Sequence, residues 1–445
     1  MKFIDTIKNI WKIDELKNRI LLTLGLLLVY RFGAQVVLPG IDASQLSGLA
    51  DQTDGGILGL LNAFTGGAFS NASVFALGIM PYISASIVVQ LMGIAIPYLQ
   101  KLQKEGESGR KKINQITRWL TIGITLLQGP GYIYNLYAIL PGSAFLMQNT
   151  TLFVASSVII LTTGCIFAMW LGEKITDKGI GNGISLLIMV GIIATLPQAF
   201  VQEFVSRVVE SNGGVIMILI ELIIWFVIIL ASVMLVMAVR QIPVQYARRT
   251  SGGSYEKTMG ARQFIPLKLN ASGVMPIIFA QAIMFVPSFA GKAINTTAVG
   301  QWMEAEFANI FGFWYNVVFA LLIIVFTYFY TAITVPTNKM ADDLKRSGGF
   351  IPGIRPGTET SEYLDRIMSQ ITLPGSIFLA LIAVFPAVMV SLLGLQQGWG
   401  LFFGGTSLLI MVGVAIDTMQ QVNAYLLNRH YDGLMKSGRK RKAVA

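Results

Sequence analysis

Cysteine, histidine and charged residues are scarce in this sequence, and their scarcity excludes several classes of function. The 445 residues include one cysteine, Cys165, and one histidine, His430. A single cysteine cannot form an intrachain disulfide framework, and without His/Cys clusters the usual ligand sets for transition metals are missing. The sequence offers no Ser/His/Asp set for nucleophilic catalysis and no GxxxxGK[ST] phosphate loop. We therefore predict no enzymatic activity, no metal and no cofactor.

Apolar residues are abundant, and this abundance predicts a polytopic membrane protein. Hydrophobic residues make up 54% of the sequence and charged residues 13%, against about one quarter charged in soluble domains. The mean hydropathy is +0.65. A bilayer span needs about 20 mostly apolar residues. Ten segments meet this need, at about residues 20–38, 72–96, 115–138, 151–171, 183–201, 214–239, 271–290, 311–336, 370–393 and 401–426.

The 33 Lys and Arg residues divide unequally between the two sides of this ten-span topology. When basic residues near a span end are counted with the adjacent connection, 30 lie on the N-terminal side and 3 on the other, and none lies in a span interior. The positive-inside rule then places both termini in the cytoplasm. The amphipathic N-terminal segment, residues 1–19, lacks the apolar core and cleavage site of a signal peptide, so we expect the first span to be retained.

Two acidic residues, Glu221 and Asp417, lie within predicted spans. Carboxylates inside a membrane are candidates for function because burying their charge is costly. The simpler interpretation, which we favour, is that each lies near a span end, where it is hydrated or paired.

An internal similarity relates the two halves of the chain. "GIMPYISA" (78–85) and "GVMPIIFA" (273–280) share five of eight residues and lie in the second and seventh spans. Five spans separate them, so two five-span halves have opposite orientations, as in an inverted repeat. Such repeats place the functional site at their interface near the midplane. Because proline disrupts helical hydrogen bonding, we predict that Pro81 and Pro276 place matched bends in two facing helices.

Branched aliphatic residues with uncharged polar neighbours recur on these spans. Residues four apart share a helix face, as do Ile79 and Ile83. Such side chains suit a hydrophobic constriction that closes to water and ions by dewetting. The alternative for each isoleucine alone is lipid contact or bundle packing, but the polar neighbours avoid lipid. The aliphatic candidates are Ile79, Ile83, Ile184, Ile188, Ile278 and Ile410, and the polar neighbours are Ser86, Gln90, Asn182 and Gln281.

The connection between the first two predicted spans is long and contains the short apolar stretch "GGILGLLNAFTGGAF". A helix of under ten residues is too short to cross a bilayer. The stretch is therefore interpreted either as a re-entrant segment that fills the outer mouth or as an interfacial helix. Glycines on both sides suit a movable element.

Six strings in order along the chain resemble the SecY family, the channel subunits of bacterial protein translocases. The resemblance extends from the first span to the basic tail. It implies an all-α polytopic membrane protein with ten transmembrane helices in two inverted five-helix halves and a short re-entrant plug helix. The strings are "FALGIMPYISASIVVQL", "KEGESGRKKINQ", "ITDKGIGNGIS", "RQIPVQYARR", "FIPGIRPG" and "FGGTSLLI".

The resemblance also implies a domain plan. The cytoplasmic segment 1–19 precedes an N-terminal half, 20–201, which contains the plug at about 57–67. An outside hinge connection, 202–213, leads to a C-terminal half, 214–426, and a basic cytoplasmic tail, 427–445. Two cytoplasmic docking loops would lie at about 240–270 and 338–369.

Residue roles follow from the same resemblance. The six isoleucines named above match the family's pore ring, and the second and seventh spans match a lateral gate into lipid. The expected gate residues are Pro81, Ser86, Gln90, Asn182, Pro276 and Gln281. The expected plug residues are Ile57, Leu58, Leu60, Leu61 and Phe64. The expected docking residues are Arg240, Arg248, Arg249 and Arg355.

The implied partners are SecE-like and SecG-like small membrane subunits, a SecA-type ATPase motor, the ribosome with its RNA, signal sequences and nascent or secretory polypeptides, and the lipid bilayer. The implied location is the bacterial plasma (inner) membrane. Basic loops suit ribosomal RNA through phosphate contacts, although they also suit anionic lipid.

Two other classes of function compete with a channel. An ion-coupled secondary transporter also uses inverted repeats and broken helices, but it usually commits a charge at the midplane to coupling. Glu221 and Asp417 are the available carboxylates, and neither lies on the proline-bearing spans. An intramembrane hydrolase would need a nucleophile and a base, and no predicted span contains histidine.

Overall fold

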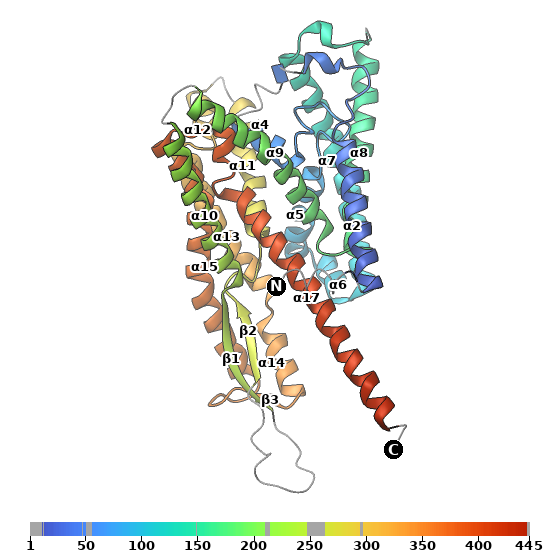
Figure 1. Ribbon diagram of the computed structural model, residues 1–445, viewed down its shortest axis with the longest axis vertical. Helices are drawn as coiled ribbons and strands as arrows, with labels where there is room; N and C mark the ends of the chain where they lie inside the picture. Colours follow the sequence, from blue (N-terminus) through green and yellow to red (C-terminus); the bar gives the residue numbers. More distant parts are fainter. Residues whose placement is uncertain are drawn as a thin grey trace. The chain divides into compact units, whose positions relative to one another are not determined.

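The computed structural model describes residues 11, 13–46, 48–49, 56–147, 149–209, 214–246, 263–293 and 297–442. Helices dominate these residues, and each of the ten predicted spans overlaps a helix (Figure 1). The elements are α2 (Asp14–Gly33), α4 (Gly56–Thr65), α5 (Met80–Ala95), α6 (Pro97–Lys104), α7 (Glu107–Ile139), α8 (Thr150–Lys178), α9 (Gly183–Val208), α10 (Gly214–Met237), β1 (Val239–Tyr246), β2 (Gln263–Lys268), α11 (Met275–Ala293), α12 (Ala298–Ala308), α13 (Phe313–Thr334), α14 (Thr337–Arg346), β3 (Gly349–Phe350), α15 (Thr358–Leu393), α16 (Gln397–Gly400) and α17 (Gly405–Lys442).

The chain forms two compact units whose division falls within the predicted hinge connection 202–213. The first unit comprises Met1–Ser211, Gln396–Leu401 and Val414–Ala445, and the second comprises Asn212–Leu395 and Phe402–Gly413. The sequence analysis placed all of 214–426 in one half. In the structure, Gln396–Leu401 and the part of α17 from Val414 onward belong with the first unit instead.

Several helices are long and apolar enough to cross a bilayer unaided. Among the described residues, α8, α9, α10, α13 and α15 meet this requirement by length and composition. Helices α5 and α6 meet it together but are bent by 102° at the break between them. Helices α2 and α7 are also long, but their first turns carry charged residues. The count of ten spans therefore stays a prediction for the remaining helices.

The two helices predicted to border a gate, α5 and α11, begin later than predicted, and the predicted proline bends are wrong. Pro81 and Pro276 are each the second residue of their helix, α5 and α11. The first turn of a helix tolerates proline because its N–H groups have no intrahelical acceptor. In each half a glycine three residues earlier has a positive φ, +54° at Gly78 and +64° at Gly273. The repeat therefore encodes a matched helix start instead of a matched bend.

A small packed module in the second unit contains the described parts of the two predicted docking loops. β1 pairs antiparallel with β2, from Val239 opposite Lys268 onward, and also with the short β3. Figure 1 shows these strands beside α14, below α13 and α15. Their apolar faces share a buried core with α14 and α15, formed by Ile242, Val244, Leu267, Leu344, Ile351, Leu364 and Met368. The predicted loops are therefore partly folded.

A hydrophobic cluster of the first unit lies near the C-terminal end of α7 and the N-terminal end of α8. It is centred on large side chains such as Tyr132, Leu136 and Phe153, which are at most 5% exposed. The chain between α2 and α4 also contributes, through Leu38 and Leu49. Leu58 and Leu61 of α4 pack against this cluster, so the short apolar helix is part of the folded unit.

Candidate functional site

Ile79 and Ile83 are positioned by a turn that is wedged between two helices. Residues 74–79 form turns before α5, and Val74 N donates to Val36 O at 2.9 Å. The absence of a side chain at Gly33 of α2 and at Gly164 of α8 makes room for Phe75 and the Val74 backbone. Ile83 N donates to Ile79 O at 3.0 Å, which fixes the spacing of the two isoleucines across the first turn of α5.

Ile184 and Ile188 are positioned by the tight turn "KGIGNGIS" between α8 and α9. Side chains from three helices hold its backbone: Thr23 accepts from Ile180 N at 3.1 Å, Gln421 from Gly181 N at 2.9 Å and Thr176 from Gly183 N at 2.9 Å. A Cβ at Gly183 would overlap the Gly172 carbonyl. These glycines therefore serve close helix packing.

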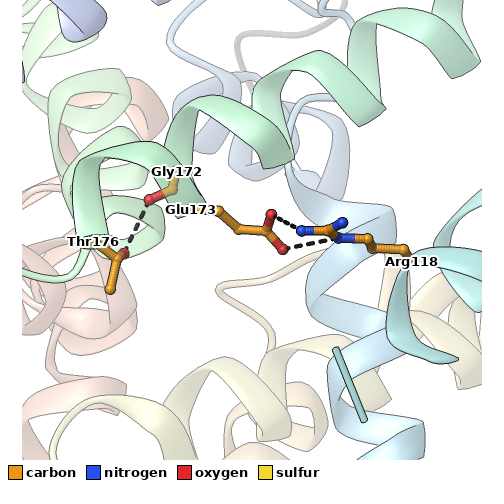
Figure 2. A network of polar contacts seen from close by, with 4 residues as sticks. All are labelled: Arg118, Gly172, Glu173 and Thr176. Atoms are coloured by element: carbon orange, nitrogen blue, oxygen red, sulfur yellow. Dashed lines mark hydrogen bonds and ion pairs between the residues drawn. The ribbon is translucent and has the colours of Figure 1, made fainter. Parts of the chain in front are cut away.

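Beside this turn, an ion pair joins α7 to α8. Figure 2 shows the guanidinium of Arg118 facing the carboxylate of Glu173, with Thr176 one turn further along α8. Arg118 Nε donates to Glu173 Oε1 at 3.2 Å, and its NH2 group contacts Oε2, so the pair is bidentate. Thr176 donates to Gly172 O at 2.9 Å while it accepts from Gly183 N. The network therefore fixes both the end of α8 and the start of α9.

Ile278 and Ile410 lie in the second unit. Ile278 is half-buried in α11. Val274, which directly precedes α11, packs against Gly413 of α17, because a Cβ added at Gly413 would lie 2.8 Å from Val274 Cγ1. The start of α17 packs closely on α15, since a Cβ at Gly404 would lie 2.7 Å from Ile382 O. The small residues of "FGGTS" therefore let the backbones of the two helices approach closely.

None of the six isoleucines has an exposed side chain. Ile79, Ile188 and Ile410 are 4%, 5% and 1% exposed, and the other three are half-buried. A lipid-facing isoleucine would be open at the surface of the protein, as Ile216 of α10 is at 76%. Each isoleucine is therefore at least partly buried in the protein, and their arrangement as one ring stays a prediction.

The polar residues expected at the gate have different partners. Gln90 Nε2 donates to Ser86 Oγ at 3.1 Å along one face of α5. Gln281 is buried and donates to Tyr315 Oη of α13 at 2.8 Å, so its amide is engaged inside the second unit. Asn182 is the N-cap of α9, where its side chain accepts from Ser185 N. Asn182 therefore has a clear local role in starting the helix that carries Ile184 and Ile188.

The short apolar helix α4 spans Gly56–Thr65 and packs against α9. Leu60 and Phe64 are buried, and Leu58 and Leu61 are half-buried. The side chain of Ile57 lies outside the described residues.

In the connection before α4, the backbone N–H and the hydroxyl of Ser44 both donate to Asp42, and these bonds lower the pKa of that carboxyl.

Two of the four expected docking arginines, Arg240 and Arg355, lie on the module of the second unit. Arg355 lies between two glycines with positive φ, Gly353 and Gly357, and its side chain is 88% exposed. Its guanidinium is 3.8 Å from the Glu359 carboxylate, and Thr360 donates to its carbonyl at 2.8 Å. Arg240 is exposed on β1, whereas Arg248 and Arg249 lie outside the described residues.

The sequence analysis missed a buried ion pair near the end of α9. Arg207 Nε donates to Glu203 Oε1 at 2.7 Å, and the residues are 6% and 2% exposed. Glu203 Oε2 also accepts from Gln396 N at 2.9 Å, which ties the segment Gln396–Leu401 to α9. Trp399 of that segment is buried against Phe200. The spacing Glu203–Arg207 was a usable signal, because residues four apart share a helix face.

Three charged residues that were expected near span ends, Arg31, Glu221 and Asp417, lie within helices. Arg31, counted with the outer connection, lies within α2 and is half-buried. Glu221 of α10 is 1% exposed, and Asp417 of α17 is exposed. Within the described ranges, no three His, Cys, Asp or Glu side chains gather closely enough to hold a metal ion.

Comparison with known proteins decides the family. The SecY family model matches residues 73–419. Protein translocase subunit SecY of Streptomyces scabiei is 39% identical over 436 residues, which cover 96% of this chain and 98% of that protein. The chain belongs to the SecY family. The SecY subunit of Vibrio cholerae is 40% identical over 432 residues, which cover 95% of each chain.

Solved structures show that the fold is also that of the SecY family. One is a SecY protein whose plug domain stabilises the closed state of the translocation channel, with a TM-score of 0.61 and 18% identity over 91% of each chain. Another is canine Sec61 in a ribosome–channel complex, with a TM-score of 0.56, 18% identity and the same coverage. The chain is therefore an all-α, multi-span membrane protein of the SecY type.

Proposed function

We propose that this chain is the pore-forming subunit of a protein-conducting channel and carries out no chemical reaction itself. The observation that carries the proposal is its identity of 39% with a SecY translocase subunit over 96% of its length. The two matched helix starts at Gly78–Pro81 and Gly273–Pro276 support it, because they mark equivalent places in two halves of opposite orientation, and inverted repeats place a transport path between such halves.

The pore is proposed to close around the six isoleucines. Four belong to the first unit, on α5 and its N-cap and on α9, and two belong to the second, on α11 and α17. Their low exposure supports a role away from lipid. Uncharged branched side chains seal against water and ions when they meet, and they bind a passing polypeptide weakly. Helices α5 and α11 would border a lateral gate through which signal sequences and transmembrane segments leave for the bilayer.

The module around Arg355 is proposed as the docking surface for an ATPase motor or a ribosome. Its own buried core, with Ile242, Leu267 and Leu364, supports the role, because a rigid base presents a guanidinium in a defined direction. The solved canine channel is bound to a ribosome, and an exposed arginine suits phosphate or carboxylate recognition. SecE-like and SecG-like subunits are proposed as membrane partners.

The proposed location is the bacterial plasma membrane with both termini in the cytoplasm. The bacterial sources of the relatives and the uneven distribution of Lys and Arg support it.

Crosslinking to a stalled secretory precursor tests the route. Single cysteines would replace Ile83, Ile278 or Ile410 in a Cys165→Ser background, with Leu321→Cys, which lies on an exposed face of α13, as the control. We expect adducts at the three isoleucine positions and none at the control. Adducts at the control alone, or at no position while the precursor is transported, would remove these residues from the path.

A further inference from the structure

The C-terminal end of α4 is held by the side chain of Arg31 from α2. Arg31 Nη1 donates to the carbonyl of Gly66, the residue after the helix, at 2.7 Å. The last carbonyls of a helix lack intrahelical donors and form the negative end of its dipole. A cation at this place therefore satisfies an acceptor and compensates the dipole in one contact. Among the described residues, no carboxylate forms an ion pair with Arg31.

The same end of α4 rests on a glycine of α9. Gly66 has a φ of +66°, and a Cβ added to it would lie 2.7 Å from the Cα of Gly191. A Cβ at Gly191 would in turn lie 2.7 Å from Phe64 O and 3.2 Å from Gly66 N. These neighbours are backbone atoms, which cannot rotate away. The pair Gly66 and Gly191 therefore lets the end of α4 seat directly on α9.

The chain after α4 is fixed as well. Thr65 Oγ1 accepts from Phe69 N at 3.2 Å, and the Asn62 side chain accepts from Ser70 N at 3.0 Å. Thr65 also fills the space at Gly78, where a Cβ would lie 2.9 Å from its methyl group. The end of α4 is thus in contact with the turn that leads to Ile79.

Gly191 is three residues after Ile188 on α9, so the two lie on the same side of the helix. A polypeptide that displaces Ile188 would therefore also move Gly191 and its contact with the end of α4. The backbones of α9 and of the end of α4 are in direct contact. Movement of α9 would therefore separate Gly191 from Phe64 and distort the hydrogen bond from Arg31 to Gly66 O.

We propose that Arg31, Gly66 and Gly191 form a latch that holds α4 closed and releases it when α9 moves. The proposal rests on the proposed function in one respect, that α4 is the plug of the channel. Arg31 is a positioning residue in this scheme, since it acts on the path through α4. The latch couples opening of the pore ring to release of the plug within the first unit.

The test uses Leu60→Cys, a buried position on α4, in a Cys165→Ser background in sealed vesicles. The rate of labelling by a membrane-impermeant maleimide reports release of the helix. Arg31→Gln is expected to raise this rate about tenfold, the change that corresponds to losing one charge-assisted hydrogen bond. Arg31→Lys, which keeps the charge but loses the planar fork, is expected to fall between Arg31→Gln and the parent.

Gly191→Ala separates the latch from simple helix stability. Alanine favours the α9 helix itself, but its Cβ collides with Phe64 O. We expect faster labelling and a higher resting ion leak than in the parent. Gly123→Ala is the matched control, because Gly123 is also in a helix and has nothing within 4 Å of the added Cβ. It is expected to leave both rates unchanged.

The outcomes distinguish the latch from the channel assignment. If Arg31→Gln and Gly191→Ala both assemble in the membrane and label at the parent rate, the latch is wrong, whether or not the parent transports precursors. If labelling rises in both variants but parent vesicles supplied with partners transport no precursor, the latch stands and the channel assignment fails. Faster labelling together with transport of precursors that carry defective signals supports both.

Discussion

Removing the charge of Glu203 should strongly destabilise the first unit. The Glu203 carboxylate receives Arg207 Nε on one oxygen and Gln396 N on the other. In Glu203→Gln, one of these donors would face an amide nitrogen, and the buried Arg207 guanidinium would lose its ion pair with Glu203. Breaking a buried pair by removing one partner costs about 3–5 kcal/mol. We expect a loss of this size in the free energy of unfolding.

The assay is denaturant-induced unfolding of the detergent-solubilised protein, with two comparison variants. Glu15→Gln removes the carboxylate of an exposed pair with the same spacing, Arg19–Glu15 at 3.2 Å, and should cost about 0–1 kcal/mol. The double variant Glu203→Gln with Arg207→Met removes both buried charges and should recover most of the loss. Equal small losses for Glu203→Gln and Glu15→Gln, or a double variant less stable than Glu203→Gln alone, would refute this reasoning.

Three further changes test other parts of the structure. Ile410→Asn buries an amide at a residue that is 1% exposed, and we expect a higher resting ion conductance in planar bilayers; parent conductance would count against the ring. Arg355→Glu alters a side chain that is 88% exposed, so motor-stimulated transport should fall while thermal stability stays the same; undiminished transport would remove it from the docking surface. Gly183→Ala forces a Cβ onto Gly172 O and should cost about 1–3 kcal/mol of unfolding free energy, whereas Gly131→Ala, with open space around it, should cost nothing; equal costs would contradict the packing argument.

Much of the fold could be predicted from the sequence because membrane spans have a strong local signal. Runs of apolar residues gave ten segments, and each overlaps a helix. The family motifs also identified the SecY family correctly. The helix starts at Pro81 and Pro276 were missed, because proline in an apolar run fits either a bend or a first turn. In the structure, a positive φ at Gly78 and at Gly273 precedes each helix, so the prolines lie in first turns. The residue types alone do not reveal this backbone conformation.

Contacts between distant segments could not be predicted. Ile242, Leu267 and Leu364 are far apart in basic, turn-rich stretches, and their shared core requires β1 and β2 to pair. The partner of Arg31 is a backbone carbonyl, which no residue pattern marks. Asn182 was expected at the gate, yet its position just before a helix also fits an N-cap, which is its observed place. Residue patterns therefore predict helices and strands, whereas contacts between distant segments depend on how those helices and strands pack.

The anchoring of Gln396–Leu401 has a consequence for biosynthesis. This segment and the chain from Val414 onward belong to the first unit, although nearly two hundred residues of the second are made before them. Until the chain has been made as far as Trp399, the Glu203–Arg207 pair lacks the Gln396 amide and Phe200 of α9 lacks its contact with Trp399. The unit that is synthesised first is therefore completed last. In a chain truncated before Gln396, the Glu203–Arg207 pair would lack this contact, and we expect quality-control proteases to degrade such a chain faster than the full chain.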